Sequence, residues 1–130
     1  MTTFGIRKPL RATYDEALVR VPEALKSEGF GVLTEIDIQG TLKQKLGVDF
    51  RRYKILGACN PPFAHQALSE DLAAGLLLPC NVVVYEAEDR RAMVMAVDPT
   101  QTVPATGNPN LAKLAETVKE KLSRAIARLE

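Results

Sequence analysis

Two apolar segments separated by only four residues, 81–86 and 91–97, constrain the fold more than any other feature of the sequence. Their β-branched and apolar residues predict strands, and the short turn at 87–90 makes the two strands antiparallel neighbours. Neither segment alternates strictly between apolar and polar residues, so both faces of these strands are expected to be covered. One layer of helices covers one face, and we expect a second subunit or a packed loop on part of the other.

Further strand and helix patterns precede this pair. Thr13 and Glu16 have the spacing of a capping box, and apolar residues three or four positions apart follow them, which predicts a helix that begins at Thr13 and stops at Gly29. Residues 31–37 alternate and predict a half-buried strand. The other predicted elements are a strand at 4–10, a short helix at 38–47, a strand at 51–58, a helix at 63–74 and a final helix from about Asn110.

The order of these elements predicts an α+β fold. Consecutive strands on short connections favour an antiparallel sheet, and each amphipathic helix must bury its apolar stripe against that sheet. We therefore expect a single domain, residues 1–130, with a mainly antiparallel sheet and helices packed on one face in two layers. Residues 98–110 are rich in Pro, Thr and Asn and are expected to form a long loop.

Charge and composition argue against several classes of protein. Seventeen basic and sixteen acidic residues leave a net charge of +1, whereas nucleic-acid-binding domains usually carry a clear basic excess. No apolar run approaches the roughly 20 residues that span a bilayer, and the first ten residues lack the apolar run of a signal peptide. We expect a cytoplasmic protein that binds neither nucleic acid nor membrane, with its two cysteines as free thiols.

The predicted topology brings the residues of greatest chemical interest to one edge of the sheet. If strands 51–58 and 81–86 are antiparallel neighbours, Cys59 and Cys80 lie at the same edge. His65, near the start of the intervening helix, and Asp98, at the end of strand 91–97, are expected there too. The partial positive charge of the helix N-terminus near Pro62 is expected to lower the pKa of a nearby thiol.

Several interpretations of these residues stay open. Cys59, Cys80 and His65 together offer two thiolates and one imidazole, a donor set that suits a soft metal ion such as copper or zinc, although the spacing is not that of a zinc finger. A cysteine close to a histidine also suits nucleophilic catalysis. Both cysteines can instead be small buried side chains, because free cysteine is among the most buried residue types. Asn60 and Asn81 are expected to hydrogen-bond the turns beside them.

Two motifs carry a resemblance to a known family. The segment Y-K-I-L-G-A-C-N-P-P-F-A-H-Q-A-L and the later segment G-L-L-L-P-C-N-V-V-V-Y-E resemble the domain-of-unknown-function family 302, and the likeness extends over residues 14–103. The resemblance implies a fold like that of the TATA-binding protein, with the order strand, helix, four strands, helix, and a homodimer. It implies no activity, and a shared fold does not imply nucleic-acid binding.

Three hypotheses of function follow. The first is a homodimer that binds a small ligand or a soft metal ion in a pocket of cysteine and histidine. The second is a thiol-dependent enzyme or redox sensor, and the third is a structural or interaction module with core cysteines. The sequence does not settle whether the chain is an enzyme. The candidate ligand-binding residues are Cys59, Asn60, His65, Cys80, Asn81 and Asp98.

Overall fold

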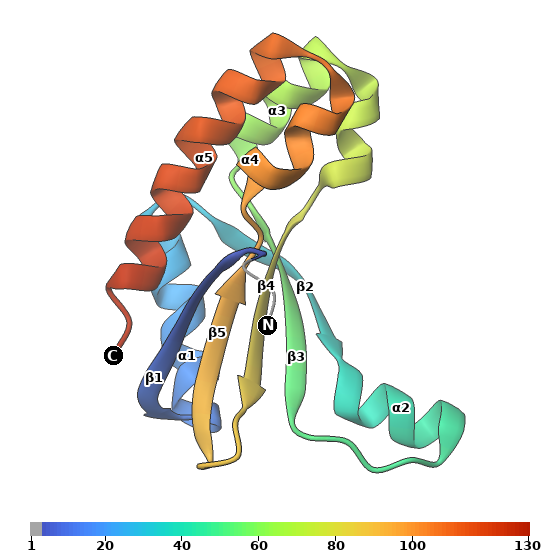
Figure 1. Cartoon of the computed structure of the whole chain (residues 1–130), viewed down its shortest axis with the longest axis vertical. Coiled ribbons are helices and arrows are strands. Elements are labelled where there is room, and N and C mark those ends of the chain that lie inside the picture. Colours follow the sequence, from blue (N-terminus) through green and yellow to red (C-terminus); the bar gives the residue numbers. More distant parts are fainter. Residues whose placement is uncertain (1–3) are drawn as a thin grey trace.

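The computed structural model describes residues 4–130, in which five strands form one open antiparallel sheet in the order β1-β5-β4-β3-β2 (Figure 1). The predicted α+β class and antiparallel sheet are confirmed. The strands are β1 (Ile6–Thr13), β2 (Gly31–Asp37), β3 (Tyr53–Cys59), β4 (Cys80–Glu86) and β5 (Arg91–Ala96). The helices are α1 (Tyr14–Ser27), α2 (Ile38–Leu46), α3 (Pro61–Glu70), α4 (Pro99–Thr102) and α5 (Pro109–Ala127), with 3-10 helices η1 (Leu72–Leu77) and η2 (Val103–Thr106).

The capping box predicted at the start of α1 is present. The backbone N–H of Glu16 donates to the Thr13 hydroxyl at 3.2 Å, and the backbone N–H of Thr13 donates to the Glu16 carboxylate at 3.0 Å. Both groups would otherwise lack a partner at the helix N-terminus. Gly29 follows the helix with a φ of +87°, a conformation that glycine adopts without a side-chain clash. The chain therefore turns from α1 directly into β2.

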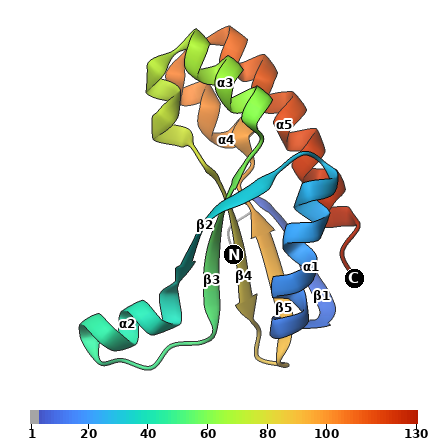
Figure 2. The same ribbon diagram turned by 180° about the vertical axis from the view of Figure 1, so that it is seen from behind.

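One face of the sheet holds the core. α1 and the C-terminal half of α5 pack on this face, which Figure 2 shows from the helical side. Val82 and Val84 of β4 and Val94 of β5 are completely buried beneath them, with exposed fractions of 0%. Helices packed on one face of the sheet were predicted, and this arrangement is confirmed.

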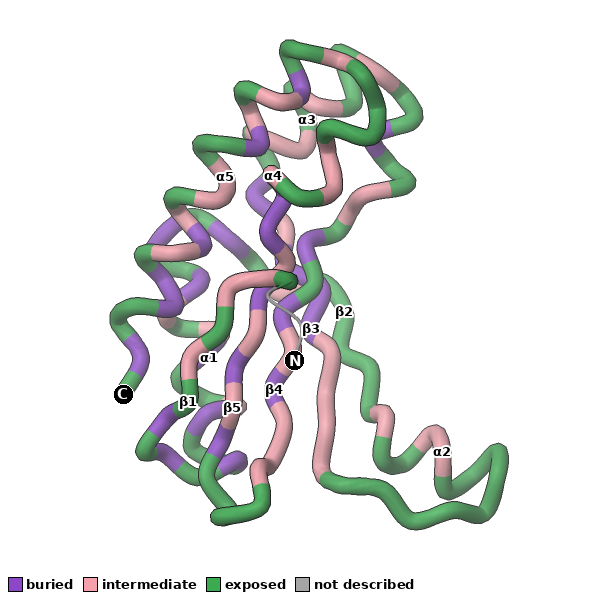
Figure 3. Tube along the Cα trace, viewed as in Figure 1, coloured by how far each residue is buried: buried purple, intermediate pink, exposed green. Residues whose placement is uncertain are grey.

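On the opposite face of the sheet, the residues of β4 and β5 are at most half-buried by the described chain. Along β4 and β5, buried residues alternate with half-buried ones (Figure 3), so Val83 lies between the buried Val82 and Val84 but faces the other way. In the described part of the chain, no helix or loop packs over this second face, which Figure 1 shows toward the viewer. The predicted cover of part of this face, by a second subunit or a packed loop, stays a prediction.

β2 and α2 extend away from the rest of the molecule (Figure 1). A half-buried strand was predicted at 31–37, but every residue of β2 except Val32 is exposed, because this edge strand lies beyond the helices that cover the core. Within residues 38–46, all of them described, no side chain of α2 is buried.

The remaining helices form a cap beyond one end of the sheet (Figure 1). α3, η1, α4, η2 and the N-terminal half of α5 contribute to it. The long loop predicted at 98–110 is wrong, because α4 and η2 occupy most of this segment. The helix predicted at 63–74 is in fact α3 followed by η1. Asp71 adopts an extended conformation between them, and its carboxylate accepts a 2.9 Å hydrogen bond from the N–H of Ala73 in the first turn of η1.

Candidate functional site

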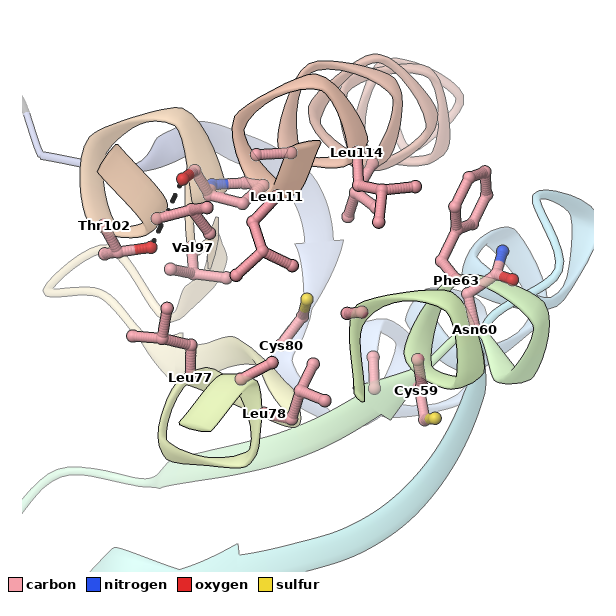
Figure 4. A pocket seen from close by; sticks show the side chains of 18 of the residues that line it. Cys59, Asn60, Phe63, Leu77, Leu78, Cys80, Val97, Thr102, Leu111 and Leu114 are labelled. Carbon is pink, nitrogen blue, oxygen red and sulfur yellow. Dashed lines mark hydrogen bonds between the residues drawn. The ribbon is translucent and has the colours of Figure 1, made fainter. Parts of the chain in front are cut away.

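An apolar cavity of about 80 Å³ lies between the end of the sheet and the helical cap (Figure 4). The ends of β3, β4 and β5 form its floor, and α3, η1, α4 and α5 form its walls. Its lining side chains are almost all aliphatic or aromatic, and include Phe63, Ala67, Leu77, Leu78, Val97, Val103, Leu111, Leu114 and Val118. The cavity is partly open to solvent, so a small molecule has a path to it.

Cys80 lies on the cavity floor as the first residue of β4. Its sulfur points into the cavity (Figure 4), and the residue is 9% exposed. Burial raises the pKa of the Cys80 thiol to about 11, and the neighbouring Cys59 contributes in the same direction. The lowered thiol pKa expected from the α3 N-terminus is therefore wrong for Cys80. Desolvation of the thiolate outweighs any favourable interaction with the helix dipole.

Cys59 lies close to Cys80, as the antiparallel pairing predicts. β3 and β4 are neighbours, and Ala58 is the register partner of Cys80. Both thiols are free. Cys59 is half-buried, and its sulfur points away from the cavity interior (Figure 4), because it follows Ala58 and successive residues of a strand face opposite sides of the sheet. One thiol therefore belongs to the cavity surface, and the other belongs to its outer edge.

Asn60 also lines the cavity, but its side chain has a structural partner. It is buried at the N-cap position of α3, and its amide donates to the backbone carbonyl of Glu28 at 3.3 Å. The hydroxyl of Thr102, a second polar group of the lining, donates to the carbonyl of Pro99 at 3.4 Å. Across residues 4–130, no buried side-chain nitrogen or oxygen lacks a hydrogen-bond partner. The cavity therefore presents apolar surface and a thiol to a ligand.

His65 lies apart from the two thiols, contrary to the expected convergence. It is exposed on α3 and borders a separate surface hollow with Gln66, Glu70 and Asn110. Phe63, Ala64 and Ala67 are the residues of α3 that face the cavity, and a helix that presents them there points His65 outward. Among the described residues, no three His, Cys, Asp or Glu side chains are grouped closely enough to hold a metal ion. The Cys59, Cys80 and His65 donor set is not assembled.

Asp98 and Asn81 have positions that differ from the expected pocket. The buried carboxylate of Asp98 caps α4, accepting a 2.9 Å hydrogen bond from the N–H of Thr100, and pairs with Lys119 of α5 at 3.0 Å. Burial opposes its ionised form, but the hydrogen bonds from Thr100 and Lys119 outweigh burial and lower its pKa. Asp98 therefore links α4 to α5. Asn81 is exposed on the sheet face away from the cavity.

Sequence reasoning missed most of the cavity wall. The aliphatic residues of α5 were expected to pack on the sheet, yet Leu111 and Leu114 lie beyond the end of the sheet and line the cavity. Pro99, Thr102 and Val103 were assigned to a loop. A signal was present in the sequence, because Val103 is an apolar residue inside the expected loop and Leu111 and Leu114 continue the apolar pattern directly after it.

Together these features define a class: a small α+β protein whose open antiparallel sheet and helical cap enclose an apolar cavity. The family model described as Domain of unknown function DUF302 matches residues 6–129, and the chain belongs to this family. A solved structure described as "uncharacterized conserved protein DUF302 from Bacillus stearothermophilus" is 32% identical, with a TM-score of 0.91, and the match covers 99% of this chain and 100% of that one. No curated protein matches the chain.

Family membership confirms the resemblance drawn from the two cysteine motifs. The family carries no assigned activity in its description, and the biochemical activity is unknown. In the described residues, no helix has the length and apolar character needed to cross a membrane. Function must therefore be inferred from the cavity itself.

Proposed function

We propose that this protein binds a small apolar molecule, or the apolar end of a larger one, in the cavity beneath the helical cap. The observation that carries the proposal is the lining, which is aliphatic or aromatic on every wall. Its polar groups already have partners in the protein, so a polar ligand would lose hydrogen bonds to water without replacing them. An apolar ligand loses none.

The size of the cavity limits the ligand. Cavities of about 150 Å³ lined by aliphatic and aromatic residues in other proteins bind benzene or xenon. A cavity of about 80 Å³ suits a group no larger than these without movement of the walls. The six residues of η1 form one wall, with Ala74 and Leu77 on the inside. A short 3-10 helix has few internal hydrogen bonds, which favours access for a ligand at this wall.

The raised pKa of Cys80 favours binding over thiol catalysis. The thiolate is the nucleophile and the metal ligand, and a thiol with a pKa of about 11 is almost entirely protonated at neutral pH. A protonated, buried cysteine behaves as a small apolar side chain and suits an apolar lining. A cytoplasmic location is part of this proposal, because two free thiols fit a reducing compartment.

Xenon is the first probe, with methyl-resolved NMR as the readout. Xenon is expected to shift the methyl signals of Leu111, Leu114 and Val97, which line the cavity, and to leave those of Leu10 and Val94 in the core unchanged. Ala67→Leu adds side-chain volume inside the cavity and is expected to abolish the shifts. Ala112→Leu is the matched control, because Ala112 lies on α5 outside the lining.

The outcomes separate the proposal from its alternatives. Shifts that survive in Ala67→Leu, or that spread evenly over core and cavity methyl groups, would place xenon elsewhere and reject the cavity as the site. If neither xenon nor benzene shifts the cavity methyl groups in the wild-type protein, the cavity is too tightly packed to bind a ligand. The structural hypothesis, with Cys80 as a core residue, would then be preferred.

A further inference from the structure

A surface hollow lies beside the cavity, on the outer side of α3. It measures about 480 Å³ and is open to solvent, and polar side chains form most of its lining. The residues that line it are His65, Gln66, Ser69, Glu70, Asn110 and Leu114. Leu114 also lines the apolar cavity, so it forms part of the wall between the two spaces. This space is called the polar hollow below.

The wall between the cavity and the polar hollow is thin. α3 packs against α5, and none of the described residues 61–70 is buried. Ala64 and Ala67 line the cavity from α3, and their side chains end at Cβ. Leu114 is half-buried and points from α5 toward the cavity (Figure 4). A leucine has several staggered rotamers, so a rotation of this one side chain is the smallest movement that connects the two spaces.

The outer surface of the cavity wall differs between η1 and α3. On η1, the side chains of Leu72 and Leu76 are 85% and 87% exposed. On α3, the side chains that line the hollow are polar. An entirely apolar molecule therefore suits entry at η1, whereas a molecule with a polar end finds hydrogen-bond partners for that end in the polar hollow.

Glu70 gives the polar hollow a negative charge. Its Oε1 atom accepts hydrogen bonds from the side-chain amides of Asn110 at 2.9 Å and Asn108 at 3.3 Å. Within residues 4–130, no lysine, arginine or histidine forms an ion pair with Glu70, and its Oε2 atom accepts no hydrogen bond. Two amides therefore hold the carboxylate in place and leave one of its oxygens to accept from a ligand.

We propose that the cavity and the polar hollow together bind a small primary amine with a short alkyl chain, with the chain in the cavity and the ammonium group beside Glu70. The inference rests on the proposed function, because it places the apolar end of the ligand in the same cavity. A primary amine is protonated at neutral pH, as a lysine side chain is, and its three N–H groups are donors. Glu70 accepts one of them with opposite charge, and the Ser69 hydroxyl and the Gln66 carbonyl are acceptors for the others.

A carboxylate end group is the main alternative, and the charges of the polar hollow argue against it. Glu70 would repel a carboxylate there. A cation does lie beside another part of the cavity lining, because Nζ of Lys121 is 5.9 Å from the centre of the Phe63 ring. Phe63 is in the first turn of α3 and Glu70 is its last residue, so the two charges lie near opposite ends of this helix. An anionic ligand would depend on Lys121, and a cationic ligand would depend on Glu70.

Methyl-resolved NMR titrations with n-butylamine, 1-butanol and pentanoate test the inference. The three molecules share one butyl chain, which is smaller than benzene, and differ in the charge of the end group. n-Butylamine is expected to shift the methyl signals of Leu111, Leu114 and Val97 and to bind at least about threefold more tightly than 1-butanol. Nuclear Overhauser effects are expected from the terminal methyl group of the amine to Leu111, and from the methylene next to its nitrogen to the ring protons of His65.

Glu70→Gln removes the charge of the carboxylate but keeps an oxygen that accepts from Asn108 and Asn110. It is expected to weaken the binding of n-butylamine about three- to tenfold and to leave the binding of 1-butanol unchanged. Glu116→Gln is the matched control, because Glu116 is an exposed glutamate of α5 outside both linings, and it should change neither affinity. Ala67→Leu, which fills the cavity, should abolish the binding of both molecules.

The outcomes distinguish this inference from the proposed function. If xenon shifts the cavity methyl signals but n-butylamine binds no more tightly than 1-butanol, or binds Glu70→Gln as well as the wild-type protein, the inference is overturned and the cavity remains a binding site. Tighter binding of pentanoate that Lys121→Gln weakens also overturns it. If neither xenon nor n-butylamine shifts these signals, the proposed function fails and this inference fails with it.

Discussion

Burial sets the chemistry of Cys80. Its sulfur faces an apolar cavity, where the thiolate would lose its hydration without gaining a cationic partner. The protonated form is therefore preferred in the folded protein, and the pKa rises from an ordinary 9.0 to about 11. The raised pKa affects the stability of the fold as well as the reactivity of the thiol, because the unfolded chain releases the same proton at lower pH.

The pH dependence of stability follows from this shift. Below pH 9 the thiol is protonated in both states and its contribution is fully present. Between pH 9 and pH 11 only the unfolded state loses the proton, so the free energy of unfolding falls, by up to about 2–3 kcal/mol for a shift of this size. The free energies of unfolding of the wild-type protein and of Cys80→Ala, measured with urea from pH 8 to pH 11, should converge or cross. Parallel curves would contradict the raised pKa.

The sequence predicts the position of Cys80 but not that of His65. Antiparallel pairing of β3 with β4 follows from short connections, and it places Cys59 and Cys80 at one edge regardless of side-chain detail. His65 lies on a helix, where a rotation of 100° per residue decides which side chains face inward. That rotation is set by how Phe63 and Ala67 pack against the cap, which local sequence does not encode.

At the scale of elements, the close approach of β2 to β3 depends on Gly57. A β-carbon at this position would lie 2.8 Å from Cγ of Pro79 and would also clash with the Thr34 hydroxyl. The register between β2 and β3 shifts at the same place, between Val32 and Thr34. A glycine in a strand often marks such an approach of neighbouring groups.

Gly57→Ala is therefore expected to destabilise the fold by about 1–3 kcal/mol, the usual cost of forcing an extra methyl group into a packed site. Gly31→Ala is the control, since Gly31 also lies in the β2–β3 pair but a β-carbon there would have no atom within 4 Å. Its effect should stay within about 0.5 kcal/mol. Thermal and urea unfolding measure both changes. If the two variants lost equal amounts of stability, the loss would come from reduced backbone flexibility and not from the contact with Pro79.

The cap was harder to predict than the sheet. Strands are recognised by their β-branched runs, whereas α4 and η2 are four residues each and depend on caps such as Asp98 that also resemble ordinary turn openers. Asp71 starts η1 by the same kind of side-chain bond, while its backbone N–H donates to the carbonyl of Ala67 at the end of α3. The burial of β2 was overestimated, because alternation shows that a strand has two unlike faces but not whether a helix covers either one.

At the scale of the molecule, Glu28 connects the two helices of the core layer. Its buried carboxylate follows α1 and pairs with Arg124 at 3.0 Å and Arg128 at 2.9 Å, both at the end of α5. Burial opposes the ionised carboxylate, but the two arginines outweigh burial and lower the pKa of Glu28. The pair therefore joins segments that are almost one hundred residues apart in the chain.

Acid should weaken this connection. A lowered pKa means that the contribution to stability is present above the ordinary carboxyl pKa of 4.5 and is lost as pH falls through the lower value in the folded state. The stability difference between the wild-type protein and Glu28→Gln should therefore shrink between pH 7 and pH 3. Glu23→Gln changes an exposed glutamate of α1, and its difference from the wild-type protein should stay small throughout. A constant difference for Glu28→Gln would refute the lowered pKa.

α5 belongs to both halves of the molecule. Leu111 and Leu114, in its first turns, form part of the cavity wall, while Leu122 and Ile126, three turns further on, are buried in the core against α1. A continuous helix transmits a tilt at one end to the other, since its hydrogen-bonded backbone resists bending. The cavity wall and the core therefore share one continuous helix, and a ligand that tilts the start of α5 is expected to shift Leu122 and Ile126 in the core as well.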